Sequence, residues 1–597
     1  MQVKCGIEIH QRLLSSKLFC PCSGESASGK PEFEITRMQH AVLSELGEAD
    51  RAAEFESARG RQFVYQVYDN NCPVEMDEEP PHPLNERALA IALEIAMLLN
   101  SKPLEEIQIM RKAVIDGSNT SGFQRTAVIG FGGSISADGK AIGIQTVSLE
   151  EESAGIVGEN GGTATFRLDR LGIPLVEIAT APDISSPAEA RAVAEAIGTL
   201  LRMTGKVARG IGTIRQDLNI SIEGGARTEL KGAQELGMID SIVQKEIDRQ
   251  AKLVELKPRI KKVRVQELKI IDLTQTLKNT NSGLAKRALE AGGKALGFKL
   301  SGYAGLLGFE LCEGRRFGTE VSDYAKRAGV RGILHGDEDL KGYKFSETEI
   351  VEMRKTLGVS DKDSFIMVLA HEAAAGKALE LAFSRAITSE VPEETRKVLP
   401  DGSSSFMRPL PGGARMYPET DVPPVRITAD RLARTRKSLP QKPDEKRRQL
   451  LSMLNEELAN KMMKSRNLHM FERLLETGAD PVVISTTLEE TLVSLRRAGV
   501  AVEKISEERL AELFEEFGNG KFVKAAIPEI ITHAAKDAGA RISHLVSSLN
   551  LSRISSAELK KLAEAEGNDL KRIMAKYRLR VDAKELAELL TKRKENK

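Results

Sequence analysis

The stretch DRLGIPLVEIAT, residues 169–180, places one acidic side chain, Glu177, inside an apolar run. The surrounding apolar side chains, which predict a buried β-strand, are Ile173, Leu175, Val176 and Ile178. A carboxylate in such a strand needs a cation, a hydrogen-bond donor or a raised pKa, because an unpaired charge is costly in a medium of low dielectric. One interpretation is a salt bridge in the core, to Arg170 or Arg191. The other is a role as a ligand for a bound cation.

Two further stretches favour the second interpretation. LEEESAG, residues 149–155, contains three consecutive glutamates, and GIEIHQRL, residues 6–13, contains a glutamate and a histidine. Alternate residues of a β-strand project from the same face, so Glu8 and His10 are expected to point together. With Glu177 these groups would form an oxygen-rich site for a hard cation such as magnesium, although a histidine near the start of a chain often has a structural role.

The composition is that of a large protein without membrane spans. A chain of 597 residues is expected to form several domains, since a single core rarely exceeds about 300 residues. Charged residues make up 29% and hydrophobic residues 41%, and we find no run of about 18 apolar residues and no signal-peptide pattern. Five cysteines are too few for a disulfide scaffold. We expect a cytoplasmic protein with no membrane partner, whose net charge of +1 leaves nucleic-acid binding to local basic patches.

The first 272 residues have the pattern of a mixed, mainly antiparallel sheet with flanking helices. The predicted strands are residues 3–10, 63–67, 107–115, 141–149 and 218–222. Two long helices are predicted at 85–99 and 187–203, where apolar residues recur every three or four positions. A hairpin is expected at Gly224-Gly225, between RQDLNISI and RTELKG.

The rest of the chain has a different character. Four parts follow, namely a glycine-rich α/β segment (273–405), a proline- and glycine-rich strap (406–430) and two helical parts (431–500 and 501–597). Basic side chains gather at 431–448 and at 560–580. A charge run is usually a solvated face, but two such patches in a nearly neutral chain also suit contacts with a phosphate backbone. The pattern as a whole predicts a multidomain α+β protein with an all-helical C-terminal tail.

Two other groups of residues have the spacing of ligands. Cys20 and Cys22, followed by Cys72 and Glu75, look like part of a zinc ribbon in which Glu75 stands in place of the fourth cysteine. We therefore expect these cysteines to be small apolar side chains rather than ligands of a structural zinc.

MRKAVIDGSNTSGFQRT, residues 110–126, suits phosphate binding but equally a solvated loop. The chain contains no Walker A sequence, so ATP, if used, is not held by a P-loop.

Six segments together resemble a known family. In chain order they are GIEIHQRL (6–13), KLFCPC (17–22), LEEESAG (149–155), DRLGIPLVEIATAPD (169–183), RQDLNISI (215–222) and ELKG (229–232). They are similar to signatures of the B/E family of tRNA-dependent amidotransferase subunits. The segments at 301–326 and 408–424 look like an insertion related to aspartyl-tRNA synthetase and the strap of the archaeal E branch, and the tail after about residue 430 is similar to the family's helical and YqeY-like tail.

The resemblance implies a reaction and its cofactors. ATP would phosphorylate the side-chain carboxylate of a glutamate misacylated on tRNA(Gln), and ammonia would displace the phosphate to give Gln-tRNA(Gln). The residues that match the family's catalytic magnesium site, with Glu8 adjoining, are His10, Glu151 and Glu177. The family usually has LEEDA where this chain has LEEES, so Glu150 or Glu152 is an alternative to Glu151. The residues expected to bind ATP are Arg111, Lys112, Ser118, Arg215 and Lys231.

The resemblance also implies partners. We find no Ser-Ser-Lys or Cys-His-Glu arrangement for amide hydrolysis, so ammonia would come through a channel from the family's asparaginase-like D subunit, in a heterodimer that assembles into a heterotetramer. Residues 1–272 would form a catalytic cradle for the acceptor end of the glutamate-charged tRNA(Gln). The tail and the insertion would contact the body of the tRNA.

Two alternatives remain open at the level of sequence. One is a bacterial-type B subunit that also acts on Asp-tRNA(Asn), which the insertion disfavours. The other is a non-catalytic scaffold that binds tRNA and whose acidic cluster is structural.

Overall fold

The computed structural model describes residues 2–41, 47–48, 50–57, 60–160, 162–263, 267–412, 415–537 and 539–595. The chain forms two compact units, one of Met1–Gly198 with Lys206–Leu439 and one of Thr199–Gly205 with Pro440–Lys597. Within the described residues, no helix combines the length and the apolar character needed to cross a bilayer.

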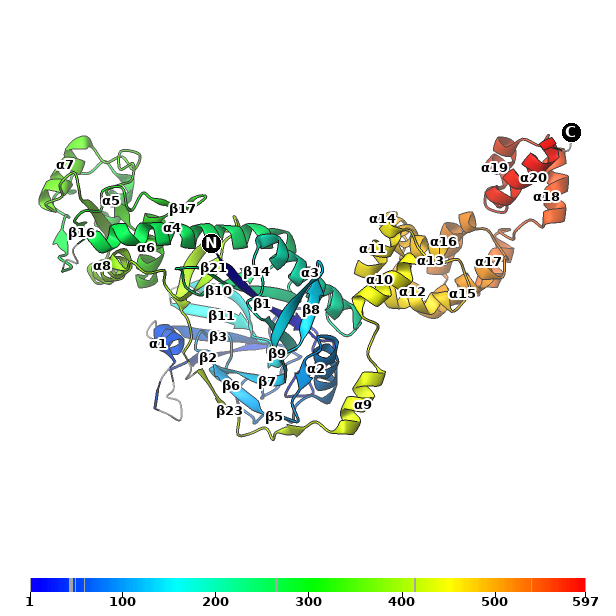
Figure 1. The fold of residues 1–597 in the computed structure, drawn as a ribbon, viewed down its shortest axis with the longest axis horizontal. Coiled ribbons are helices and arrows are strands. Elements are labelled where there is room, and N and C mark those ends of the chain that lie inside the picture. The colour runs from blue at the N-terminus through cyan, green and yellow to red at the C-terminus, as the bar shows by residue number, and fades with distance from the viewer. Residues whose placement is uncertain are drawn as a thin grey trace. The chain divides into compact units, whose positions relative to one another are not determined.

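A 12-stranded sheet forms the body of the first unit (Figure 1). Its main order is β22 (Ser404–Pro409), β21 (Glu394–Val398), β14 (Thr228–Ala233), β13 (Ile214–Ile222), β1 (Val3–Arg12), β12 (Pro174–Thr180), β9 (Lys140–Glu151), β7 (Phe123–Phe131), β6 (Ile109–Ala113) and β23 (Met416–Pro418). Two short strands complete it, β4 (Lys102–Pro103) beside β7 and β8 (Ser134–Ala137) beside β9. The pairs along this order are antiparallel except β14 with β21, which is parallel. The predicted mixed, mainly antiparallel sheet is confirmed.

The strap joins the two edges of this sheet. β22 and β23 are the first and last strands of the order, and only residues 410–415 connect them. Such a connection spans at most about 25 Å, whereas ten strands laid flat would hold their edges about 43 Å apart. The sheet therefore curls, which brings its two edge strands closer together. The strap continues as β24 (Val425–Arg426), which pairs with β5 (Glu106–Ile107).

Helices cover the sheet where the sequence predicts them. α2 (Glu86–Leu98) packs against β7 and β9, and the side chain of its N-cap residue, Asn85, accepts hydrogen bonds from the first turn. α3 (Pro187–Met203) has the predicted bounds, and the Gly224-Gly225 turn joins β13 to β14 as expected. The predicted strand at 107–115 is instead two short strands, β5 and β6, that pair with different partners.

A smaller sheet and an α/β segment complete the first unit. The smaller sheet has the order β10 (Gly155–Asn160), β11 (Thr163–Arg167), β3 (Gln62–Val67) and β2 (Phe33–Met38). The α/β segment has a sheet of β15 (Ile271–Asp272), β16 (Lys294–Leu300), β20 (Ser364–Ala370) and β19 (Leu334–His335) and a hairpin of β17 (Glu310–Cys312) and β18 (Arg315–Arg316). The helices of this unit not yet named are α1 (Arg51–Ser57), α4 (Ile239–Lys262), α5 (Gly283–Glu290), α6 (Phe317–Ala325), α7 (Glu347–Thr356), α8 (Glu372–Ile387) and α9 (Ala429–Lys437).

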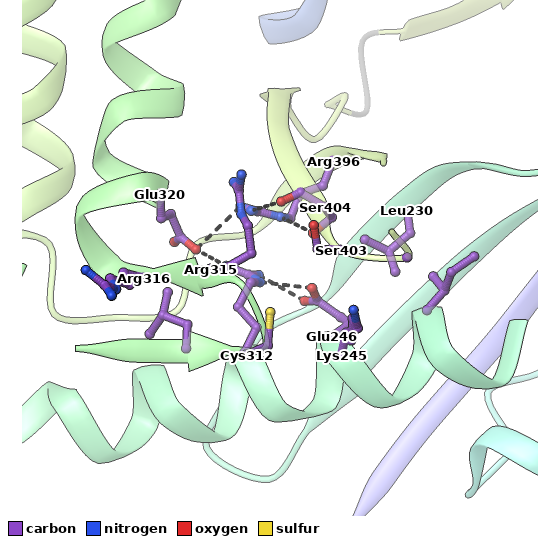
Figure 2. Close-up of a pocket in the computed structure, with 14 residues that line it drawn as sticks. Leu230, Lys245, Glu246, Cys312, Arg315, Arg316, Glu320, Arg396, Ser403 and Ser404 are labelled. Carbon is purple, nitrogen blue, oxygen red and sulfur yellow. Dashed lines mark hydrogen bonds and ion pairs between the residues drawn. The ribbon is translucent and has the colours of Figure 1, made fainter. Parts of the chain in front are cut away.

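Buried ion pairs tie the α/β segment to the large sheet. Glu320 of α6 is 2% exposed and accepts hydrogen bonds from Arg249 of α4 at 2.8 Å and from Arg385 of α8 at 3.0 Å. Arg396 of β21 lies 3.7 Å from the same carboxylate (Figure 2). Arg396 also pairs with Glu394. Since these residues come from α4, α6, α8 and β21, the segment is fixed to the sheet by charge as well as by apolar packing.

The second unit is helical, as the sequence predicts. Its helices are α10 (Pro443–Leu451), α11 (Glu456–Lys464), α12 (Leu468–Leu475), α13 (Pro481–Thr486), α14 (Leu492–Arg497), α15 (Glu507–Gly518), α16 (Ile527–Lys536), α17 (Ile542–Ser548), α18 (Ser556–Ala565), α19 (Leu570–Tyr577) and α20 (Ala583–Glu595). One core gathers buried side chains from Leu450 to Leu551 and a second gathers them from Ile554 to Leu590. The first core includes residues on both sides of position 500.

Candidate active site

The central strands bring the predicted acidic residues onto one face of the curled sheet. His10 of β1 is the cross-strand partner of Glu177 on β12, and Glu8 is the partner of Asp217 on β13. Directly opposed residues of an antiparallel pair project from the same face. Through the pairing of β12 with β9, Glu150 also projects from this face. Five chemistry-bearing side chains from four adjacent strands therefore meet in one place.

His10 links two groups of carboxylates. Its Nδ1 lies 3.6 Å from Oε2 of Glu177 and 4.0 Å from Oε2 of Glu150. Its Nε2 lies 3.8 Å from Oδ2 of Asp217. In each of two sets, Glu8–His10–Asp217 and His10–Glu150–Glu177, the ligand atoms lie within 4.8 Å of one another. Both sets have donors that suit a divalent cation.

A lysine side chain lies beside each of these two sets of carboxylates. Nζ of Lys112, on β6, pairs with Glu150 and lies 3.7 Å from Glu177. Nζ of Lys231, on β14, lies 2.9 Å from Asp217 and 2.9 Å from Glu229. These groups neutralise buried carboxylates, and they are also cations of the kind that bind phosphate oxygens.

The surroundings shift the pKa values of the carboxyl groups in different directions. Burial raises the pKa of Glu150, but Lys112 and His10 outweigh it and bring the pKa to about 2. Burial and the neighbouring Glu150 raise the pKa of Glu177. Burial and Glu177 raise the pKa of Glu8 to about 7. A cation bound among these groups would favour their charged forms and so lower the pKa values of Glu8 and Glu177.

These residues line a cavity of about 670 Å³ over the curled face. Its cationic lining residues are Lys112, Arg215, Arg227, Lys231, Arg408 and Arg415. Cavities of this size accommodate ligands as large as nucleotides. The arrangement, with carboxylates and an imidazole beside several cations, suits a phosphorylated ligand together with a divalent ion.

Most of the residues expected to bind ATP lie in this cavity. Those that line it are Lys112, Ser118, Arg215 and Lys231. Arg111 does not line the cavity. Its guanidinium donates to Glu419 at 2.5 Å and to Asp421 at 3.0 Å, and it lies over the ring of Phe123 at 4.6 Å. Alternation along β6 explains the difference, because Arg111 and Lys112 are neighbours and point to opposite faces.

Glu151, the residue expected to complete the cation site, lies apart from it. Oε2 of Glu151 accepts a hydrogen bond from the backbone N–H of Arg125 at 3.0 Å. Glu152 is bound by Arg12 and Arg170. The structure thus joins Glu150 to His10 and Glu177, because alternation along β9 turns Glu151 to the other face. Glu150 was one of the alternatives that the sequence left open.

The core salt bridges considered for Glu177 do not form. Arg170 pairs with Glu152, and Nε of Arg191 lies 3.4 Å from Oδ2 of Asp240. Glu177 instead faces His10 and Lys112.

The charged residues of the cavity that were not expected as site residues from the sequence include Asp217, Arg408 and Arg415. Asp217 shares a polar strand face with Arg215, and that alternation was the signal that could have included it. Arg408 and Arg415 come from the strap, about 230 residues beyond Glu177 and about 300 residues beyond Lys112. No local sequence pattern links them to the site.

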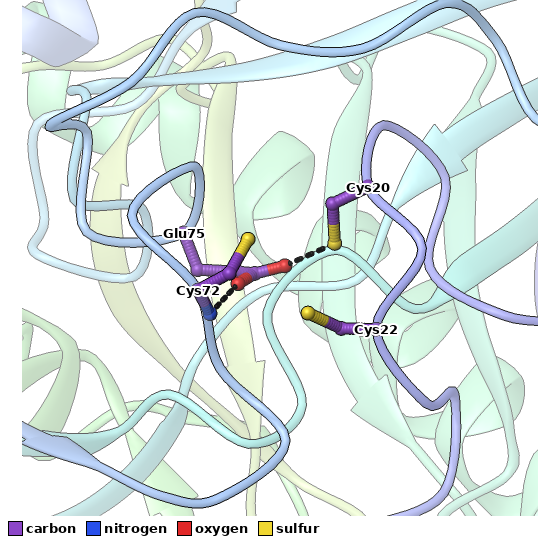
Figure 3. A group of neighbouring side chains, drawn as sticks. All are labelled: Cys20, Cys22, Cys72 and Glu75. Atoms are coloured by element: carbon purple, nitrogen blue, oxygen red, sulfur yellow. Dashed lines mark hydrogen bonds between the residues drawn. The ribbon is translucent and has the colours of Figure 1, made fainter.

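The cysteine group takes a form different from the one expected. Sγ of Cys20, Cys22 and Cys72 and a carboxylate oxygen of Glu75 lie within 4.8 Å of one another (Figure 3). Glu75, which stands in place of a fourth cysteine in the sequence, thus brings a carboxylate oxygen to the three sulfurs. Nζ of the buried Lys17 lies 3.4 Å from Oε1 of Glu75 and would offset part of the negative charge of three thiolates. Three sulfurs and one carboxylate oxygen are a donor set that fits zinc.

Comparisons with known proteins identify the family. Residues 3–433 match the GatB/GatE catalytic domain, and residues 469–584 match a GatB domain of the YqeY type. The E subunit of the glutamyl-tRNA(Gln) amidotransferase of Methanocaldococcus jannaschii is 41% identical, with 99% of this chain and 98% of the relative covered. The protein of the same name from Sulfolobus acidocaldarius is 44% identical, with 89% of this chain and 86% of the relative covered. The one from Pyrococcus abyssi is 42% identical, with 94% of this chain and 90% of the relative covered. The resemblance read from the sequence motifs is confirmed, and the chain belongs to the GatB/GatE family of amidotransferase subunits.

Proposed function

We propose that this chain is the subunit of a glutamyl-tRNA(Gln) amidotransferase in which the glutamyl side chain of misacylated Glu-tRNA(Gln) is phosphorylated by ATP and then converted to the amide. The names of its relatives support the substrate. The observation that carries the proposal is the cluster of His10, Glu150 and Glu177 in a cavity lined with cations. Phosphoryl transfer to a carboxylate brings two anions together, so it needs a site of this kind.

The residues of the cluster fit magnesium. Glu150 and Glu177 offer carboxylate oxygens on one side of the cavity, and His10 offers a ring nitrogen between them. Since magnesium prefers oxygen and keeps several waters, His10 would act mainly through a bound water. A magnesium ion bound by this set would neutralise charge on the phosphates during transfer. Glu8 adjoins the set, and Glu150 takes the role first expected of Glu151.

The lining cations would hold the nucleotide. Lys112 and Lys231 each stand beside a carboxylate group, so the phosphates of ATP would meet an ammonium group on either side of His10. Ser118 and Arg215 line the same cavity and offer further donors. The adjacent carboxylates keep the pKa values of both lysines raised, so both remain charged at neutral pH.

The remaining assignments follow the family resemblance. An asparaginase-like partner, the family's D subunit, would supply ammonia, in a heterodimer that assembles into a heterotetramer, and the complex would act in the cytoplasm. The segment 273–405 would be a domain like that of aspartyl-tRNA synthetase, set between the cradle of residues 1–272 and the strap of residues 406–430. The helical parts 431–500 and 501–597 would contact tRNA.

Ammonium chloride can replace the ammonia-supplying partner in a test of this function. The purified chain is incubated with Glu-tRNA(Gln), ATP and magnesium, and Gln-tRNA(Gln) and ADP are measured. We expect one ADP for each glutamine formed, and no glutamine when ATP is omitted. Tight tRNA binding without ATP-dependent product would identify a scaffold and contradict the proposal. Equal turnover of Asp-tRNA(Asn) would instead identify a B-type subunit.

A further inference from the structure

Arg408 is a buried cation for which the described part of the chain supplies no counter-ion. It lies at the end of β22 and is 7% exposed, and its Nε is sealed from solvent without a hydrogen-bond partner. Within the described ranges, its guanidinium makes no ion pair with any carboxylate. A buried charge normally has a partner, because its desolvation is otherwise uncompensated. An anion that is not part of the chain would supply that partner.

Arg415 adds a second cation to the same cavity. It lies just before β23, and its Nε donates to the carbonyl oxygen of Ala113 at 3.4 Å. Burial and the neighbouring Arg408 lower the pKa of Arg415. The two guanidinium groups repel each other in a partly desolvated cavity. An anion bound by both would offset this repulsion.

The strap determines where that anion would lie. β22 and β23 are the opposite edges of the curled sheet, so Arg408 and Arg415 reach the cavity from the two ends of one crossing segment. The residue after Arg415, Met416, is the cross-strand partner of Lys112. Lys112 in turn pairs with Glu150 of the cation cluster. The anion would therefore lie between the strap and the cluster formed by His10, Glu150 and Glu177.

We propose that Arg408 and Arg415 bind the terminal phosphoryl group of ATP as it is transferred to the glutamyl carboxylate, an assignment that rests on the proposed function. In that step a carboxylate oxygen forms a bond to the γ-phosphorus while the bond from phosphorus to the β,γ-bridging oxygen breaks. ADP leaves with that electron pair, and no proton is moved. The three oxygens of the transferred group carry the developing charge, which two planar guanidinium groups can bind in a bidentate manner.

The burial of Arg408 distinguishes this anion from a tRNA phosphate. Contacts with a polynucleotide backbone come from side chains that are accessible at the surface. Arg408 is instead 7% exposed and lines the cavity. A small anionic group that enters the cavity, such as a phosphoryl group, meets this requirement.

The test compares two nucleotides that differ only in the γ-phosphoryl group. Full-length Arg408→Gln and Arg415→Gln chains are titrated with ATP and with ADP in the presence of magnesium. Loss of one charged hydrogen-bonding partner is expected to weaken ATP binding by about 10- to 100-fold. Affinity for ADP is expected to stay within about 3-fold of the wild type, because ADP lacks the group that the arginines bind. The ATP affinity of Arg408→Lys should lie between those of wild type and Arg408→Gln, since lysine keeps the charge but cannot form a bidentate contact.

Arg426→Gln is the matched control. Arg426 is an exposed arginine on β24 of the same strap and does not line the cavity, so both affinities should be unchanged. Equal loss of ATP and ADP binding, or no loss of either, would overturn the assignment. So would a loss of Glu-tRNA(Gln) affinity with nucleotide binding intact. If Arg408→Gln does not fold, the half-buried Arg415 gives the same comparison. Failure of the wild-type chain to form Gln-tRNA(Gln) would contradict the proposed function itself and is measured separately.

Discussion

His10 and Glu177 are direct cross-strand partners in the middle of the 12-stranded sheet, and Nδ1 of the histidine lies 3.6 Å from a carboxylate oxygen of the glutamate. Both residues are held by strands that are paired on each side. The geometry of the cluster is thus set by the register of the sheet and not by a loop. Sites built on paired strands in this way are well positioned before a ligand binds.

The helical tail can be tested separately from the cavity. The cavity, the strap and α9 all belong to the first compact unit, which ends at Leu439. A chain that ends at Leu439 should keep its affinity for ATP and lose affinity for Glu-tRNA(Gln). The slope of log K against log salt should also become shallower, because fewer phosphate contacts release fewer counter-ions. Binding measured between 50 and 200 mM salt, about a 4-fold range, gives the slope. An unchanged slope would remove the tail from the tRNA-binding surface.

The buried ion pairs of Glu320 predict a stability that depends on pH. Burial raises the pKa of Glu320, but Arg249, Arg385 and Arg396 outweigh it and hold the pKa well below its ordinary value of 4.5. As pH falls below 4.5, the unfolded chain takes up a proton at this residue before the folded chain does. The contribution of Glu320 is therefore complete above that pH and declines below it.

Glu320→Gln tests this contribution by urea unfolding at several pH values. At pH 7 the variant should lose about 3 to 5 kcal/mol, because three arginines lose a buried charged partner. Below pH 4.5 the difference between variant and wild type should shrink, because protonation of Glu320 then stabilises the unfolded wild type. Other carboxylates titrate equally in both chains and cancel in the comparison. A difference that stays constant with pH would show that Glu320 is not charged in the folded chain.

Much of the fold could be predicted from the sequence, because local patterns determine it. The apolar run around Glu177, the shared face of Glu8 and His10 and the helix at Pro187–Met203 are all local features, and the structure has each of them. The choice between Glu150 and Glu151 depended on the register of β9 against β12, which is a contact between distant segments. A shift of one residue exchanges the faces of a strand. The sequence could therefore identify the three consecutive glutamates, but not which of them faces His10 and Glu177.

The strap arginines illustrate a second limit. Arg408 and Arg415 reach the site only because the sheet curls and its edges approach each other. That closure depends on the pairing of β23 with β6 and of β22 with β21. Arg111 lies outside the cavity for a similar reason, since the position of β6 in the sheet determines which of two adjacent cations faces the cavity.

The cysteine group predicts a metal content. Burial and the carboxylate of Glu75 raise the pKa of Cys72 to about 11, and a bound zinc ion would reverse this shift by favouring the thiolate. Chain purified without chelator should contain about one zinc ion. Cys72→Ser should lower both the zinc content and the melting temperature, whereas Cys312→Ser, at a buried cysteine outside the group, should keep the zinc. Zinc-free wild type whose melting temperature does not respond to added zinc would contradict this prediction.

We propose that Glu150 and Glu177, and not Glu151, form the cation site for phosphoryl transfer with His10. The most direct measurement is ADP formation that depends on Glu-tRNA(Gln), as a function of magnesium concentration, in Glu150→Gln, Glu177→Gln and Glu151→Gln. We predict at least a 100-fold loss of rate, about 2.7 kcal/mol, in the first two variants. The third should stay within about 3-fold of wild type, because its carboxylate receives the backbone N–H of Arg125, which a glutamine oxygen can also accept. Full activity in Glu150→Gln together with loss of activity in Glu151→Gln would show that Glu151, and not Glu150, belongs to the cation site.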